Sequence, residues 1–272
     1  MILMNNLKGR VAIVTGSGRG IGRSTAVLLA KMGARVVVNM KRNIEEGNET
    51  LKQIKEVNGE GLIIQADVST DLGAKKLINE TLETFGTIDI LVNNAGVGIA
   101  KPLHEIDEIL WDKQINTNLK SAFLCSKYAS EIMIKKGWGR IINITSVAGL
   151  IGMALLIPYS AAKAGLIGLT KALAAELSPY GITVNAIAAG LVKTKMGLSL
   201  VELLAQKSNI EESATQWSLQ HTLTKKLLTP DEIANLIAFL ASEEAKNITG
   251  QVFVIDSGWS INEARNYMFI QT

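Results

Sequence analysis

A tyrosine and a lysine four positions apart could form an acid–base pair. In the run Tyr159-Ser-Ala-Ala-Lys163, both side chains would lie on one face of a helix. A phenol releases its proton near pH ~10, so Tyr159 needs a nearby cation to exchange protons near neutral pH. Lys163 supplies that cation, and we expect it to lower the pKa of Tyr159. Such a pair could move a proton to or from a substrate oxygen.

Ser146 could bring a hydroxyl to the same oxygen. It precedes Tyr159 by 13 residues and follows a predicted strand at Arg140–Ile144. In open α/β sheets, ligands bind in the crevice outside the carboxyl ends of the strands. We therefore expect Ser146 to face that crevice together with Tyr159.

A glycine-rich turn, Thr15-Gly-Ser-Gly-Arg-Gly-Ile-Gly22, follows the first predicted strand and opens a helix. Its spacing is GxxxGxG rather than GxGxxG. Backbone N–H groups in such a turn, together with the positive end of the helix, can bind a pyrophosphate. A glycine-rich turn without a ligand is the alternative, but glycine at a helix start costs up to ~1 kcal/mol relative to alanine. The residues of the turn that we expect to bind a cofactor are Gly16, Ser17, Gly18, Arg19, Gly20, Ile21 and Gly22.

The elements that must position these residues are short apolar runs alternating with amphipathic stretches of helix length. Runs such as Val11–Val14 are apolar throughout, which is typical of strands buried on both faces. We predict a Rossmann-type, doubly wound parallel sheet of about seven strands with helices on both faces. The strands are predicted at Arg10–Val14, Arg35–Asn39, Gly61–Gln65, Ile88–Val92, Arg140–Ile144, Thr183–Ile187 and Val252–Ile255.

The composition fits one α/β domain over residues 1–272. The chain is 47% hydrophobic and 19% charged, which favours a large core and excludes global disorder. Residues 191–228 follow a predicted strand end with irregular apolar spacing, and we predict a substrate lid there, which would include Met196 and Trp217. The run Thr229-Pro-Asp-Glu232 predicts the start of the next helix, with Thr229 as its N-cap.

Charge and apolar patterning argue against several classes of partner. The net charge of +3 is spread along the chain, so we expect no nucleic acid and no membrane partner. The longest apolar run, Val147–Ile157, is shorter than the about 20 residues of a spanning helix, and the first residues lack a basic region and a cleavage site. We expect a cytoplasmic protein. Cys125 is expected in the core, and the contexts of His104 and His221 predict no metal site.

The end of the second strand favours one nicotinamide cofactor. An acidic residue there would bind the ribose 2′-hydroxyl of NAD, whereas basic residues would pair with the 2′-phosphate of NADP. The chain reads Asn39-Met-Lys-Arg42 at this point and has no carboxylate. Lys41, Arg42 and Arg19 could bring three cations to the phosphate. We predict NADP (NADPH) and expect NAD less, with ordinary solvated charges as the alternative for Lys41 and Arg42.

These motifs, with Asn93-Asn-Ala-Gly96 after the fourth strand and Asn118, occur together and in order. From about Leu7 to Trp259 the chain resembles the short-chain dehydrogenase/reductase family. Within that family it is most similar to the 3-oxoacyl-carrier-protein reductases, especially at Ala161–Leu169 and in the Gly-Ile-Thr-Val-Asn run. The resemblance implies an NAD(P)-dependent oxidoreductase that transfers a hydride between nicotinamide and a carbonyl or secondary alcohol.

The resemblance also implies four catalytic roles. Tyr159 would donate the proton to the carbonyl and Ser146 would polarise the same oxygen. Lys163 would lower the pKa of Tyr159 and bind the nicotinamide ribose. Asn118 would hold a water in a proton relay behind Lys163.

Further cofactor contacts follow from the same resemblance. Asp67 and Val68 would contact the adenine. Ala189 stands where the family usually has a proline, which loosens the turn at Gly190. The remaining positions implied to line the adenosine, the ribose and the nicotinamide are Asn94, Ala95, Gly96, Gly190, Val192 and Thr194.

The substrate class rests on weaker signals. The run Val147–Pro158 before Tyr159 carries no polar side chain, which favours an apolar or acyl thioester substrate over a sugar. Alternatively, Leu155, Leu156 and Ile157 pack against the lid or a neighbouring subunit. Sugar, polyol and other alcohol dehydrogenases of the family share the same motifs, and a non-catalytic NADP-binding sensor is the alternative of another class.

Two more expectations concern macromolecular contacts. Gly137 and Tyr180 replace the arginines with which 3-oxoacyl-carrier-protein reductases commonly dock their carrier, although Lys135 and Lys136 could substitute. The resemblance implies a homotetramer formed through the Tyr159 helix and the helix before Ser146. The apolar positions expected to form a flat contact are Ala162, Gly165, Leu166 and Leu169, and the apolar tail positions expected to cover a neighbour are Tyr267, Met268, Phe269 and Ile270.

Overall fold

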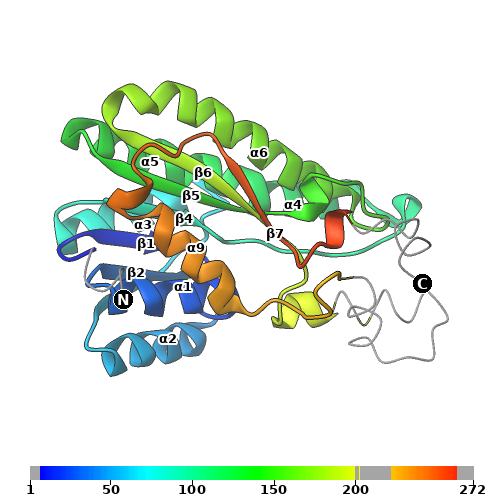
Figure 1. Cartoon of the computed structure of the whole chain (residues 1–272), viewed down its shortest axis with the longest axis horizontal. Coiled ribbons are helices and arrows are strands. Elements are labelled where there is room, and N and C mark those ends of the chain that lie inside the picture. Colours follow the sequence, from blue (N-terminus) through cyan, green and yellow to red (C-terminus); the bar gives the residue numbers. More distant parts are fainter. Residues whose placement is uncertain (1–6, 200–201, 203–221, 262–272) are drawn as a thin grey trace, which may run out of the picture.

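A seven-stranded parallel sheet forms the centre of the computed structural model, which describes residues 7–199, 202 and 222–261 (Figure 1). The strand order is β3-β2-β1-β4-β5-β6-β7, so the chain starts in the middle and winds outward in both directions. This confirms the predicted Rossmann-type sheet. The strands are β1 (Val11–Val14), β2 (Arg35–Met40), β3 (Glu60–Gln65), β4 (Ile90–Asn93), β5 (Gly139–Ser146), β6 (Ile182–Ala189) and β7 (Val252–Ile255).

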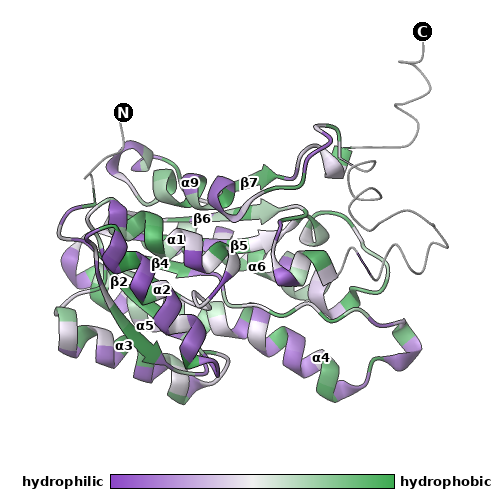
Figure 2. Cartoon of the chain, turned by 90° about the horizontal axis from the view of Figure 1, so that it is seen from below, coloured by the Kyte–Doolittle hydropathy of each residue, from purple (hydrophilic) through white to green (hydrophobic). Residues whose placement is uncertain are grey.

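Helices cover both faces of the sheet, as Figures 1 and 2 show. One face packs against α1 (Gly20–Lys31), α2 (Ile44–Glu56) and α9 (Pro230–Leu240). The other packs against α3 (Asp71–Phe85), α5 (Ser121–Lys136) and α6 (Ile157–Leu177), with α4 (Glu108–Ile115) beside α6. Short helical turns lie at Leu103–Glu105, Val147–Gly149, Ser178–Tyr180, Glu243–Ala245 and Trp259–Ile261, and a π-helix at Asn116–Lys120.

Alternate residues of the central strands enter two separate cores. In β1, Ala12 and Val14 join the core under α1 and α9, while Val11 and Ile13 join the core under α3 and α5. Both faces of β1 are buried, which explains why its residues are apolar throughout and do not alternate with polar ones. Cys125 lies fully buried in the second core, and burial raises the pKa of its thiol to about 12. Its predicted place in the core is confirmed.

The start of α9 has the chemistry that the sequence predicts. The hydroxyl of Thr229 accepts from the amide of Glu232, and the carboxylate of Glu232 accepts from the amide of Thr229. Just before this cap, a parallel bridge joins Val192 to Leu228. The two ends of the predicted lid are therefore tied together, whereas Trp217 lies outside the described residues.

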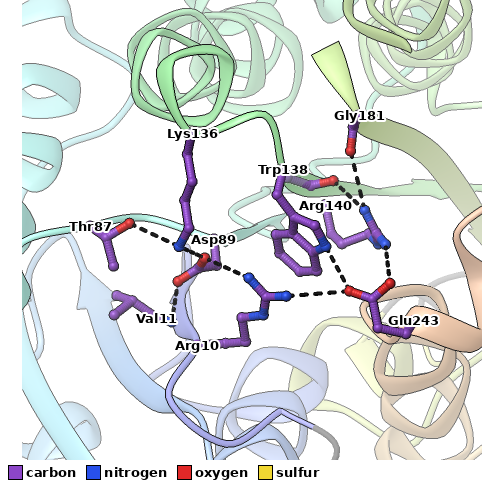
Figure 3. Close-up of polar contacts among 10 residues, drawn as sticks. Arg10, Val11, Thr87, Asp89, Lys136, Trp138, Arg140, Gly181 and Glu243 are labelled. Atoms are coloured by element: carbon purple, nitrogen blue, oxygen red, sulfur yellow. Dashed lines mark hydrogen bonds and ion pairs between the residues drawn. The ribbon is translucent and has the colours of Figure 1, made fainter. Parts of the chain in front are cut away.

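A cluster of charges occupies the amino edge of the sheet, at the opposite end from Ser146 (Figure 3). Asp89, whose side chain is fully buried, accepts from the amide of Val11 at 2.8 Å and pairs with Arg10 at 3.3 Å and with Lys136. Lys136 is therefore held by Asp89, contrary to its expected availability for an acidic carrier. Lys135 remains exposed.

The same cluster encloses the indole of Trp138 between two guanidinium groups. Arg10 lies 3.5 Å from the ring centroid and Arg140 lies 4.3 Å from it. The indole N–H donates to Glu243 at 2.7 Å, and Glu243 pairs with both arginines. These contacts join β5 to the turn after α9.

The expected contact face on α6 is wrong in part. Ala162 and Leu166 are 0% and 1% exposed, and Leu166 lies inside the chain rather than on its surface. Gly165 lies against Leu119, where a Cβ atom would come within 2.8 Å of a methyl carbon. These positions pack α6 inside the subunit, because α6 lies directly over β5 and β6. The tail positions 267–270 lie outside the described residues. No described helix is long and apolar enough to cross a membrane.

Candidate active site

Four predicted site residues reach the carboxyl edge of the sheet from three segments. Ser146 is the last residue of β5, and Tyr159 and Lys163 lie in the first two turns of α6. Asn118 lies in the π-helix between α4 and α5. Single π-helical turns are frequent at functional sites because they displace the side chains that follow. The structure thus brings together residues from separate parts of the chain.

Tyr159 is partly buried and shares a hydrogen bond with Ser146. Burial raises the pKa of its phenol, and the hydrogen bond with Ser146 only partly opposes the rise. The structure therefore shows a raised pKa where we expect Lys163 to lower it. The ammonium of Lys163 lies 5.5 Å from the centroid of the Tyr159 ring, and its own charge is disfavoured by burial.

Lys163 is a buried cation that the fold holds in place. Its side chain donates to the carbonyl of Ile144 at 2.8 Å, and its own carbonyl accepts from Thr145 at 2.8 Å. Only 4% of the residue is exposed, and in the described part of the chain no carboxylate forms an ion pair with it. Burial consequently lowers the pKa of Lys163 to about 8. Such perturbed groups in a crevice are typical of functional sites.

Asn118 fixes the loop after β4 beside Lys163. Its side-chain oxygen accepts from the amide of Val97 at 3.1 Å, and its amide donates to the carbonyls of Val97 and Gln114, each at 2.8 Å. A Cβ atom at Gly96 would lie 2.8 Å from the Asn118 oxygen and 3.6 Å from the Lys163 nitrogen. Only glycine lets this loop pass between the two side chains.

The glycine-rich turn leaves the first N–H groups of α1 available to an anion. Arg19 is the N-cap of α1 but makes no side-chain capping bond, and the first turn holds no acidic residue. Gly20 has a φ of +56°, which favours glycine. A Cβ atom there would meet the side chain of Thr194, with the methyl carbon at 3.1 Å. An open, uncapped helix start of this kind fits a cofactor pyrophosphate.

At the other positions of the turn, close packing requires glycine, rather than the predicted approach of the backbone to a phosphate. A Cβ atom at Gly16 would lie 2.9 Å from Cα of Ala95, and one at Gly22 would lie 2.5 Å from the side-chain nitrogen Nδ2 of Asn94. These two glycines let the turn pack against the loop after β4. Gly18 instead lies against Glu46, because a Cβ atom at Gly18 would lie 3.0 Å from Cβ of Glu46.

Sequence reasoning overlooked two polar residues that shape this turn. The hydroxyl of Thr15 accepts from the amides of Asn94 and Ala95, each at 3.0 Å. The buried side chain of Asn39 accepts from the amide of Gly16 at 3.4 Å. Both are polar residues at strand ends, and a polar group that the fold buries there requires partners. Their position at the ends of buried strands was the signal by which the sequence could have indicated them.

The predicted adenine side contains more negative charge than the end of β2 indicates. Asp67 follows β3 and pairs with Lys41 at 2.6 Å, while Glu46 of α2 pairs with Arg19 at 3.0 Å. Burial acts to raise the pKa of the Asp67 carboxyl, but hydrogen bonds from Lys41 and Ser69 outweigh it and lower the pKa. Both Lys41 and Arg42 are exposed, and the Val68 side chain is buried.

The predicted nicotinamide side is built by the segment after β6. Gly190 lies against Asp256, because a Cβ atom would come within 2.7 Å of Cα of Asp256. The hydroxyl of Thr194 accepts from the amide of Gly197 at 3.1 Å and starts a helix at 195–199. The methyl of Thr194 also lies beside Gly20, 3.1 Å from where a Cβ atom at Gly20 would be. The two cofactor-binding segments that the sequence predicts thus lie side by side.

The segment Val147–Pro158, which forms an apolar wall before Tyr159, has an exposed apolar surface. Leu150, Ile151 and Ile157 are 44%, 38% and 38% exposed, whereas Leu156 is buried. The carbonyl of Leu155 accepts from the amide of Lys101 at 2.9 Å, which joins this wall to the loop after β4. A hollow of about 340 Å³ adjoins it, lined by Leu103, Ile106, Asp107, Glu108, Trp111 and Ile157.

The doubly wound sheet, the glycine turn and the Ser-Tyr-Lys group define a nicotinamide-dependent oxidoreductase of the Rossmann type. Residues 10–203 match the model of the short chain dehydrogenase family. The chain belongs to that family. His104 is exposed, His221 lies outside the described residues, and no metal-binding cluster occurs in the part that the structure describes.

Relatives cover almost the whole chain. A 3-oxoacyl-[acyl-carrier-protein] reductase of Synechocystis is 41% identical over 94% of this chain and 98% of its own length. The (2S)-[(R)-hydroxy(phenyl)methyl]succinyl-CoA dehydrogenase subunit BbsD of Thauera aromatica is 40% identical over 94% of this chain and 98% of its own. The crystal structure of levodione reductase has a TM-score of 0.89 and 34% identity, covering 94% of this chain and 99% of that one.

Together, fold, motifs and relatives establish the class of reaction. The protein is an oxidoreductase that acts on CH–OH or carbonyl groups and uses a nicotinamide cofactor. The relatives named above act on different substrates, so membership of the family does not select one.

Proposed function

We propose that this protein is an NADPH-dependent reductase of 3-oxoacyl thioesters. The observation that carries the substrate class is the wall between Ser146 and Tyr159, which exposes Leu150, Ile151 and Ile157 and has no polar side chain. A sugar would leave its hydroxyls without partners there, at a cost of about 1–3 kcal/mol for each unpaired group. An acyl chain would bury apolar surface on the same wall.

Two of the relatives support the thioester. The Synechocystis protein is named as a reductase of 3-oxoacyl groups on a carrier protein, and the Thauera protein as a dehydrogenase of a CoA thioester. In both names the reacting group belongs to an acyl thioester. We propose the same class of substrate here, reduced at a carbonyl carbon.

The proton comes from Tyr159. The cofactor, when bound, supplies the hydride to the carbonyl carbon. Tyr159 donates its phenolic proton to the carbonyl oxygen, and Ser146 donates a hydrogen bond to the same oxygen, so that negative charge does not build up on it. The raised pKa of Tyr159 keeps the phenol protonated before the reaction.

Lys163 and Asn118 support Tyr159. The ammonium of Lys163 stabilises the phenolate once the proton has left, and it would bind the hydroxyls of the nicotinamide ribose. Asn118 positions the loop beside Lys163 and would hold a water through which Tyr159 regains its proton. Because burial already lowers the pKa of Lys163 to about 8, a small electrostatic change can move its proton near neutral pH.

The remaining cofactor contacts are proposed from the glycine-rich turn and from the segment after β6, which lie side by side. The N–H groups of Gly20, Ile21 and Gly22 would bind the pyrophosphate, and Thr194 would bind the nicotinamide carboxamide. Arg19, Lys41 and Arg42 would bind the 2′-phosphate. We further propose one domain, a lid at 191–228 and a cytoplasmic homotetramer.

Initial rates with NADPH and with NADH on acetoacetyl-CoA, aliphatic ketones and aldoses would test this function. We expect acetoacetyl-CoA to have the highest kcat/KM and NADPH to be preferred. Activity on aldoses or polyols alone would favour a sugar or polyol dehydrogenase instead. Tight NADPH binding without turnover of any carbonyl or alcohol would indicate a sensor.

A further inference from the structure

Two carboxylates lie among the cations proposed to bind the 2′-phosphate. Glu46 Oε1 lies 3.0 Å from Arg19 Nη1, and Asp67 Oδ2 lies 2.6 Å from Lys41 Nζ. In the described part of the chain Arg42 has no such partner. Three positive and two negative side chains therefore leave one net positive charge, where the sequence after β1 and β2 indicates three cations and no carboxylate.

Glu46 is held over the glycine turn by its backbone. Its carbonyl accepts from Arg23 at 3.2 Å and from the hydroxyl of Thr50 at 3.1 Å, and its amide donates to Asn43 at 3.3 Å. Its Cβ lies 3.0 Å from the position of a Cβ at Gly18. Since these contacts do not involve the carboxylate, a glutamine at this position would keep the same place without the charge.

The two pairs differ in what else they do. Asp67 also accepts from the amide and hydroxyl of Ser69, at 3.1 and 2.6 Å, and is proposed to contact the adenine. Removal of the Asp67 carboxylate would therefore weaken the binding of both NADP and NAD. The carboxylate of Glu46 has only Arg19 as its partner in the described part of the chain. Glu46 is therefore the residue whose charge can be tested alone.

We propose that Glu46 is a specificity-determining residue that weakens the selection of NADP over NAD. This inference rests on the proposed binding of the 2′-phosphate by Arg19. A phosphate dianion must share Arg19 with Glu46 and is repelled by that carboxylate, which lies within a few Å of the shared guanidinium. The 2′-hydroxyl of NAD carries no charge and feels neither effect. Glu46 thus reduces the affinity for one cofactor and leaves the other almost unchanged.

Calorimetric titration of Glu46→Gln with NADP⁺ and NAD⁺ tests the proposal without turnover. We expect the affinity for NADP⁺ to rise about two- to fivefold, the range of an exposed ion pair, and the affinity for NAD⁺ to change less than that. Adenosine 2′,5′-bisphosphate against 5′-AMP should show the same difference. The gain should shrink between low salt and about 0.5 M salt, because exposed charges are screened.

The matched control is Glu45→Gln. Glu45 is exposed in the same first turn of α2, so its removal changes the charge at that helix start equally. An equal effect of the two variants would overturn the proposal, because it would then reflect net charge alone. An equal change in the affinities for NADP⁺ and NAD⁺ would overturn it as well.

A double variant identifies the route of the effect. In an Arg19→Gln background, Glu46→Gln should have a much smaller effect on NADP⁺ affinity, because the shared cation is gone. A full effect in that background would overturn the role of Arg19. If the unmodified protein prefers NAD⁺, the proposed cofactor preference fails, but the change that Glu46→Gln causes in the ratio still tests this inference separately.

Discussion

The two ends of the sheet both bury charged side chains, but only those at the amino edge have partners of opposite charge among the described residues. At the amino edge, buried Asp89 pairs with Arg10 and Lys136, and buried Arg140 pairs with Glu243 (Figure 3). At the carboxyl edge, Lys163 is 4% exposed and donates to the carbonyl of Ile144, and in the described residues it has no carboxylate partner. Paired charges stay fixed, whereas an unpaired buried ammonium has a pKa that can move.

The pKa values follow this difference. Burial lowers the pKa of Arg140 too, but Glu243 opposes that change, and a guanidinium stays protonated in any case. Burial lowers the pKa of Lys163 to about 8, within reach of physiological pH. The amino edge therefore holds its charges in fixed pairs, and the carboxyl edge keeps a group that can exchange protons. Three predictions test this comparison.

Tyr159→Phe should give the largest effect. Without the phenolic hydroxyl no proton reaches the carbonyl oxygen, so we expect kcat to fall about 10²–10⁴-fold, the usual contribution of a general acid. The ring keeps its place and cofactor binding should persist. Steady-state rates with acetoacetyl-CoA and the quenching of protein fluorescence by NADPH measure the two properties. Unchanged kcat would refute the assigned role of Tyr159.

Asp89→Asn should act on stability instead. The substitution leaves Arg10 and Lys136 facing each other without a carboxylate, and we expect the free energy of unfolding to fall by about 2–4 kcal/mol. Urea denaturation measures the loss, while kcat per folded molecule should stay the same. Glu83→Gln, an exposed change on α3, is the control and should have little effect. A reduced kcat in folded Asp89→Asn would contradict the separation, because it would show that the charges of the amino edge also affect catalysis.

The pH dependence of stability should reveal Lys163. The unfolded state keeps the lysine proton up to pH 10.5, whereas the folded state releases it near 8, so the unfolded state binds more protons in between. Stability contributed by this residue therefore rises with pH across that window. Between pH 8 and 9.5 we expect the protein to gain about 1–2 kcal/mol relative to Lys163→Met.

Urea denaturation of both proteins at one protein concentration measures this gain. The raised pKa of Tyr159 acts in the other direction, but only from about pH 10 upward, where the unfolded phenol loses its proton first. Both proteins contain Tyr159, so the difference isolates Lys163. Parallel curves from pH 8 to 9.5 would show that Lys163 has an ordinary pKa.

The sequence is sufficient for the strands, for the start of α9 and for the arrival of Ser146, Tyr159 and Lys163 at one edge. These features depend on local periodicity and on the rule that parallel strands end together. It is insufficient for the apolar face of α6, since Ala162 and Leu166 serve the subunit's own interior. Spacing shows which residues share a helix face but not what covers that face.

The charges show the same division most clearly. The sequence by itself determined which ionisable groups exist and that Arg19, Lys41 and Arg42 lie close to the first two strand ends. Only the tertiary structure decided that Glu46, 27 residues after Arg19, neutralises it, and that burial lowers the pKa of Lys163 to about 8. The reason is that a charge depends on the solvent and partners around it, and folding supplies both from distant parts of the chain.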